Sequence, residues 1–168
     1  MEAKMERVIH PFDPVSDSKS KILILGTMPS PTSRETGFYY SHQRNRFWKV
    51  LSLVVEQEFP ATIPERKAFL LKNRIALWDV LGQCEIQNAE DGSIENPIPN
   101  NLLTIFNSSD IQAVFTNGKT PEKLYKKYWA HKYPFLEPIG LPSTSPSNCR
   151  WSLGDLVKEY EKMLPFLK

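Results

Sequence analysis

The sequence predicts an α/β fold of three layers, in which helices cover both faces of a central, mostly parallel four-stranded sheet. Four short apolar segments predict the strands, and their near-continuous hydrophobicity is typical of strands buried on both faces. Segments with apolar residues at helical spacing lie between them. This alternation of strands and helices is typical of a three-layer α/β domain.

The predicted strands are short and most lead into a polar turn. They span residues 21–26 (KILILG), 75–80 (IALWDV), 111–117 (IQAVFTN) and 134–142 (PFLEPIGLP). We expect the fourth strand to lie at an edge or a bulge, because Pro138 has no backbone N–H to donate from a central position.

Helical segments fill the gaps between these strands. The helix over residues 120–129 should begin with Thr120 as its N-cap, and the helix over residues 152–164 with Ser152. The remaining helices are expected over residues 46–59 and 63–74, with a short one within residues 100–109.

The length of 168 residues fits one domain. We expect a single domain over residues 21–168, preceded by a polar leader over residues 1–20. The polar segment 87–100 is expected to be an exposed loop.

The composition is that of a soluble globular protein. Hydrophobic residues make up 40% of the chain, and the net charge of +2 gives no bulk attraction to nucleic acid. Cys84 and Cys149 match no disulfide, zinc or iron–sulfur spacing, so we expect no metal and a reducing, cytoplasmic location. We expect no membrane contact, since no apolar stretch approaches the roughly 20 residues of a spanning helix.

Polar residues gather where the predicted strands end. Ligands of open α/β sheets bind outside the carboxyl ends of the strands. The four ends lie at Gly26, near Asp79, at 117–119 and at 141–152, so the sequence predicts one cleft built from four strand ends.

The residues expected in this cleft suit a nucleotide. Tyr40 and its aromatic neighbours could stack on a flat ring, and Asn45 and Asn117 carry amides that suit the edge of a base. Hydroxyl groups in 143–147 precede a helix and could hold a phosphate. These features favour a nucleotide over another small molecule only modestly, because loops are generally polar.

Two long motifs carry a family resemblance. The segment GTMPSPTSRETGFYYSHQRNRFW (26–48) resembles motif one of the uracil-DNA glycosylase superfamily, and its GF-x-x-x-H-x-x-NRFW part is similar to that of mismatch-specific thymine/uracil glycosylases. LPSTSPSN (141–148) resembles motif two of the hypoxanthine-DNA (deoxyinosine) glycosylase branch, which ALWDVL and FTNGKT also fit. Met28 stands where most of the superfamily has Asp or Asn. The hypoxanthine branch also lacks a polar residue at this position.

The resemblance implies a monofunctional DNA glycosylase. Such an enzyme flips a deaminated base out of DNA and hydrolyses its N-glycosidic bond without metal or cofactor. Deoxyinosine is the first expectation for the substrate and uracil the second. The expected partner is double-stranded DNA, with single-stranded DNA as a further option, and the protein is expected to be a monomer.

The resemblance also assigns roles to residues. Asn45 would position the water, and His42 would stabilise charge on the leaving base. The base pocket would consist of Gly26, Thr27, Met28, Pro29, Tyr40 and Asn117, with Tyr40 stacked on the base and Asn117 reading its edge. DNA would be held by Ser143, Thr144, Ser145, Asn148, Arg150 and Lys119, with Asn148 and Arg150 as candidate wedges in the base stack.

Plainer interpretations stand beside these roles. Asn45 could cap the helix that follows it, Asn117 could be a turn residue, and His42 could be structural. Asp79 could orient a loop or a water, but it is expected rather to cap a turn. Other candidate functions are a uracil/thymine mismatch glycosylase, a catalytically silent DNA-binding module and a serine hydrolase, although the chain lacks the G-x-S-x-G elbow.

Overall fold

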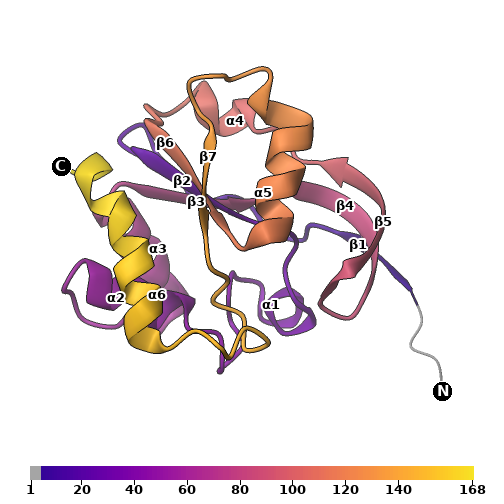
Figure 1. Cartoon of the computed structure of the whole chain (residues 1–168), viewed down its shortest axis with the longest axis horizontal. Helices are drawn as coiled ribbons and strands as arrows, with labels where there is room; N and C mark the ends of the chain where they lie inside the picture. The colour runs from indigo at the N-terminus through magenta and orange to yellow at the C-terminus, as the bar shows by residue number, and fades with distance from the viewer. Residues whose placement is uncertain (1–4) are drawn as a thin grey trace.

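The computed structural model describes residues 5–168 and contains two sheets. The larger sheet has four parallel strands in the order β3-β2-β6-β7 (Figure 1). The strands are β2 (Ile22–Gly26), β3 (Ile75–Asp79), β6 (Ala113–Asn117) and β7 (Pro138–Leu141). The predicted fold class, a four-stranded parallel sheet between helices, is therefore confirmed.

The central strand β2 is buried along its whole length because both of its faces are covered. Ile22 and Ile24 belong to one core cluster, and Leu23 and Leu25 belong to the other. Alternate side chains of a strand point to opposite faces. The continuous run of aliphatic residues in β2 is therefore what a sheet with two covered faces requires.

Helices cover the first face of this sheet at the left of Figure 1. They are α2 (Phe47–Val54), α3 (Ile63–Lys72) and α6 (Leu153–Tyr160), which ends in the 3-10 turn η2 (Glu161–Phe166). On the second face lie α4 (Leu103–Phe106), α5 (Lys119–Tyr125) and the π-helical turn η1 (Lys126–Ala130). No helix in residues 5–168 is long and apolar enough to cross a membrane.

The smaller sheet is antiparallel and was not predicted. Its strands are β1 (Glu6–Ile9), β4 (Leu81–Gln87) and β5 (Glu90–Pro99), in the order β1-β4-β5. The expectation of a loop over residues 87–100 is wrong, because β5 pairs with β4 there. Most of the β5 side chains are exposed, so the strand lacks the apolar alternation that would have indicated it.

Part of the expected polar leader is also structured. Residues 1–4 lie outside the described residues, but β1 pairs with β4, and Val15 pairs with Leu77 of β3. The leader therefore carries residues that pack against the two sheets.

The α-helices are mostly shorter than predicted; the one expected over residues 46–59, for example, ends at Val54. A short helix, α1 (Pro31–Thr36), lies in the loop after β2, capped by Ser30. Helix α5 begins at Lys119, so Thr120 is not its N-cap. The capping prediction for Ser152 is confirmed, because its side chain accepts a hydrogen bond from the backbone N–H of Asp155.

The edge position predicted for the fourth strand is confirmed as well. β7 pairs only with β6 and begins at Pro138, where the missing backbone N–H costs least. Beyond β7 the chain enters the loop 142–152, which lies beside α1 at the lower edge of Figure 1.

Candidate active site

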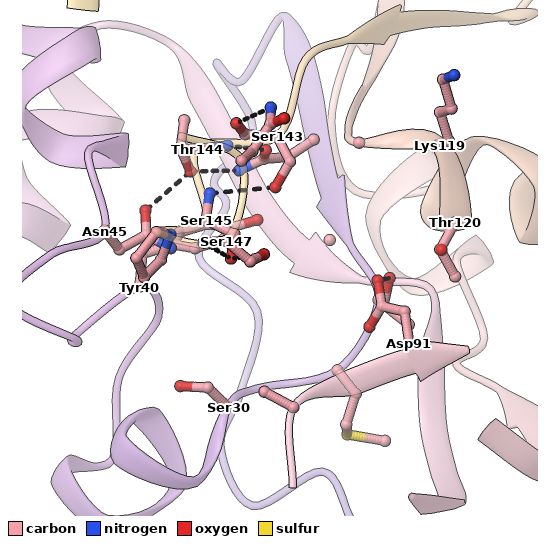
Figure 2. A pocket seen from close by; sticks show the side chains of 18 of the residues that line it. Ser30, Tyr40, Asn45, Asp91, Lys119, Thr120, Ser143, Thr144, Ser145 and Ser147 are labelled. Carbon is pink, nitrogen blue, oxygen red and sulfur yellow. Dashed lines mark hydrogen bonds between the residues drawn. The ribbon is translucent and has the colours of Figure 1, made fainter. Parts of the chain in front are cut away.

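One cleft of about 1200 Å³ opens at the carboxyl ends of the four parallel strands. Every residue predicted for the site lines this cleft, as expected from the rule that ligands bind at the carboxyl ends of the strands. The predicted residues in its wall are Gly26, Thr27, Met28, Pro29, Tyr40, His42, Asn45, Asn117, Lys119, Ser143, Thr144, Ser145, Asn148 and Arg150. Figure 2 shows several of them converging on the cleft.

Gly26 allows two side chains to lie against the end of β2. A Cβ atom at this position would be 2.5 Å from Oδ1 of Asp79 and 2.7 Å from the hydroxyl oxygen of Tyr40. Both distances are shorter than any normal contact of a carbon atom, so only glycine fits without displacement. The absence of a side chain at Gly26 thus lets Asp79 and Tyr40 both lie against the end of β2 at the floor of the cleft.

Tyr40 is held rigidly in the cleft wall. Its backbone has a left-handed φ of 51°, and its ring packs edge-on against Phe47 with the centroids 4.1 Å apart. Its buried hydroxyl has no partner within hydrogen-bonding distance in the described chain. Burial, followed by the charge of Asp79, raises the pKa of Tyr40 well above its usual range, so the phenol stays neutral.

Asn45 is fixed by its carbonyl oxygen. Oδ1 accepts hydrogen bonds from the backbone N–H of Phe47 at 3.0 Å and from the hydroxyl of Thr144 at 2.8 Å. The first bond caps the start of α2, as the plainer interpretation expected. Within residues 5–168 no hydrogen bond engages Nδ2, so the side chain presents an N–H donor in the wall of the cleft.

Asn117 is tied into the protein by three hydrogen bonds. Oδ1 accepts from the backbone N–H of Thr144 and from the hydroxyl of Tyr160, and Nδ2 donates to the hydroxyl of Thr144, each at 3.0 Å. Only 8% of Asn117 is exposed. This arrangement favours a supporting role for Asn117 over the predicted contact with the edge of a base.

Thr144 links the two motifs. Its side chain is fully buried and bonds to both Asn45 and Asn117, so it is placed to support them rather than to hold a phosphate. Ser143 and Ser145 are partly exposed and remain available to DNA. The buried chain from Tyr160 through Asn117 and Thr144 ends at Asn45, and it sets the position of that amide.

Arg46 anchors the loop 142–152 through hydrogen bonds to its backbone. Its guanidinium group donates to the backbone carbonyls of Trp151 at 2.5 Å and Asn148 at 3.1 Å. The side chain of Asn148 donates to the carbonyl of Ser143, which ties it inside the loop. Arg150 is exposed and lines the cleft, so of the two predicted wedges it is the freer side chain.

His42 stands at the rim. It is exposed, and its Nδ1 accepts a hydrogen bond from the backbone N–H of Arg44 at 3.1 Å. That bond supports the local turn and leaves Nε2 as the ring atom that can contact a ligand.

The sequence reasoning missed two features of the acidic residues of the cleft, namely the partner of Asp79 and the presence of Asp91. Asp79 does not cap a turn; its Oδ2 lies 2.7 Å from Nε2 of His10, and both side chains are only 4% exposed. Asp91 reaches the cleft from β5. The His10 partner and Asp91 were overlooked because they lie in segments taken as leader and loop, and no local pattern indicates a contact over 69 residues.

Comparisons with known proteins agree with this geometry. The family model of the uracil DNA glycosylase superfamily matches residues 12–168. A hypoxanthine DNA glycosylase of Methanosarcina barkeri is 31% identical over 110 residues, covering 64% of this chain and 70% of that protein. A second hypoxanthine DNA glycosylase, from Methanosarcina acetivorans, is 30% identical over 149 residues, covering 84% of this chain and 89% of the relative.

A solved structure shares the fold. The solution NMR structure of a candidate uracil DNA glycosylase from Methanosarcina acetivorans superposes with a TM-score of 0.77 at 24% identity, covering 94% of this chain and 99% of the other. The resemblance predicted from the two motifs is confirmed by the family model and by the relatives. The chain belongs to the uracil DNA glycosylase superfamily.

Proposed function

We propose that this DNA glycosylase removes hypoxanthine from double-stranded DNA by hydrolysing the N-glycosidic bond of deoxyinosine. The two relatives named as hypoxanthine DNA glycosylases support this choice of base. The cleft also has room for a flipped nucleotide, since ligand pockets commonly measure roughly 300–1,000 Å³ and this one measures about 1200 Å³.

The observation that carries the proposal is the way in which the side-chain amide of Asn45 is hydrogen-bonded. Its Oδ1 is occupied by two protein hydrogen bonds, which leaves Nδ2 as a fixed donor in the cleft. A donor of this kind binds a lone pair of a water oxygen and aims the other lone pair, but it cannot remove a proton. Asn45 therefore orients the attacking water instead of acting as a strong base.

Tyr40 supplies the surface against which the flipped base packs. Enzymes that act on a base take it out of the stack and hold it between aromatic or apolar side chains. The ring of Tyr40 is fixed by Phe47 and by its own left-handed backbone, so it need not reorganise when the base enters.

The DNA backbone is held at the rim of the cleft. Ser143 and Ser145 offer hydroxyl groups, and the cations of Lys119 and Arg150 lie in the same wall. Arg150 is the candidate wedge that fills the vacated position in the stack. Because one chain supplies all of these contacts, we expect the protein to bind duplex DNA as a monomer.

A panel of single-lesion duplexes tests the proposal. Purified protein is incubated with duplexes that carry one deoxyinosine, deoxyuridine, deoxyxanthosine or thymine mismatch, and abasic sites are read as alkali-labile strand breaks. We expect the fastest cleavage on deoxyinosine. Faster cleavage at uracil or at mismatched thymine would favour the mismatch-specific alternative, and binding without cleavage of any duplex would favour a silent DNA-binding module.

A further inference from the structure

The cleft contains a carboxyl group that none of the roles above uses. Asp91 lies on β5, and its Oδ2 accepts a hydrogen bond from the hydroxyl of Thr27 at 3.2 Å. Because Thr27 directly follows β2, this bond ties the β4–β5 hairpin to the parallel sheet. Figure 2 shows Asp91 near Thr120, on the side of the cleft away from Asn45 and Tyr40.

The surroundings of Asp91 favour its protonated form. Asp91 is an exposed residue of β5, but its carboxyl group faces the cleft, and desolvation there raises its pKa most. The hydroxyls of Thr27 and Thr120 lower the pKa in part and the charge of Asp79 raises it, so that it lies above the usual range. Asp79 and Asp91 line the same cleft as Tyr40, the residue proposed to pack against the base.

Charged groups of both signs face this region from the other elements. Glu90 precedes Asp91 on β5, and Lys119 and Glu122 stand on α5. Burial raises the pKa of the Cys84 thiol, the charge of Arg34 on α1 lowers it, and the charge of Asp91 raises it again. The acidic side chains Glu90, Glu122 and Asp79 therefore stand beside Asp91 together with the basic Lys119. Neighbouring negative charges disfavour the ionisation of a carboxyl group.

We propose that Asp91 is the general acid of this cleft and gives its proton to a ring nitrogen of the departing purine. The inference rests on the proposed function and names the group that assists the leaving base. Met28 cannot exchange a proton, and Asp91 is hydrogen-bonded to the residue immediately before it. The hairpin therefore brings an acid to the strand end at which β2 itself supplies none.

The step balances without a co-reactant other than water. The bond between C1′ and the base nitrogen breaks, and its electron pair goes to the base. The O–H proton of Asp91 passes to a ring nitrogen of the base, which leaves as neutral hypoxanthine. The oxygen of the water held by Asn45 bonds to C1′, and the proton that this water loses restores the acid form of Asp91 through solvent.

The test compares Asp91→Asn with the wild type in single-turnover cleavage of a deoxyinosine duplex from about pH 5 to about pH 9. We expect the wild-type rate to be level at low pH and to fall about tenfold per pH unit once Asp91 ionises. Asp91→Asn should be slower by about 100-fold or more at the low-pH plateau and should lose the alkaline fall.

Two further variants sharpen the test. Asp91→Glu keeps an acid and should retain part of the rate together with the alkaline fall. Thr27→Val removes the hydrogen bond that lowers the pKa of Asp91, so the fall should move to higher pH. Asp110→Asn, which changes an exposed carboxylate that pairs with Lys21, is the matched control and should match the wild type.

The outcomes separate this inference from the proposed function. If the wild type cleaves deoxyinosine but Asp91→Asn matches it at every pH, the acid role is wrong and the glycosylase function stands. A wild-type rate that rises as Asp91 ionises would also overturn the inference, because the carboxylate would then be the active form. If the wild type cleaves no deoxyinosine duplex at all, the proposed function itself fails.

Discussion

The two walls of the cleft are built differently. On one side, Tyr160, Asn117, Thr144 and Asn45 form a continuous buried hydrogen-bond chain on the parallel sheet. On the other side, the β4–β5 hairpin carries Asp91, whose Oδ2 accepts a hydrogen bond at 3.2 Å from the hydroxyl of Thr27, the residue after β2. A network of several linked hydrogen bonds fixes a group in place, whereas a carboxyl group held by fewer bonds in a partly open cleft can exchange a proton.

The comparison predicts its largest loss of stability on the buried side. Asn117→Ala should lower the free energy of unfolding by about 3 kcal/mol, because Thr144 and Tyr160 lose their shared partner in a dry environment. Urea denaturation measures the change. Asn107→Ala on the exposed end of α4 is the control and should cost little. A loss below about 0.5 kcal/mol at Asn117 would show that the network is not a structural support.

A smaller loss should follow from Thr144→Val, which keeps the shape of the side chain and removes its hydrogen bonds. Asn45 then loses one of the two bonds that hold its Oδ1. We expect a cost of about 1–2 kcal/mol in stability and a cleavage rate at least roughly 10-fold lower. Affinity for the lesion duplex, measured by fluorescence anisotropy, should barely change. A pure loss of affinity with an unchanged rate would contradict the positioning role; Thr104→Val on the exposed surface is the control.

The smallest change in stability should come from the hairpin side, with the opposite sign. The pKa of Asp91 is higher in the folded than in the unfolded chain, so the folded state binds more protons between the two pKa values. The free energy of unfolding therefore falls as the pH rises through this interval. Asp91→Asn removes this effect, so its Tm at neutral pH should equal or slightly exceed that of the wild type. The difference should vanish near about pH 3, where both states are protonated. A clearly lower Tm at neutral pH would mean that Asp91 is part of the structural support.

Local pattern was enough to predict the parallel sheet and the contents of its cleft. Strands such as β2 are continuous apolar runs, and the rule for strand ends then places Asn45, Tyr40 and Asn117 together. Neither rule depends on contacts between distant residues. The fold class and the location of the cleft therefore followed from the sequence.

The second sheet and the acids could not be predicted in the same way. β5 is mostly exposed and carries Pro97 and Pro99, so it has the composition of a loop. The pairing of His10 with Asp79 joins residues from opposite ends of the first half of the chain. Such contacts are set by tertiary packing, and the partner of Asp79 and the position of Asp91 became visible only in the folded structure.

The central claim is that the amide of Asn45, held by Thr144 and by the start of α2, directs water at the sugar of a flipped deoxyinosine. Single-turnover cleavage of a deoxyinosine duplex by Asn45→Ala measures this most directly, with circular dichroism to show that the variant is folded. We expect the rate to fall by roughly 100-fold or more while the duplex still binds. A folded Asn45→Ala protein that cleaves deoxyinosine at the wild-type rate would contradict the account.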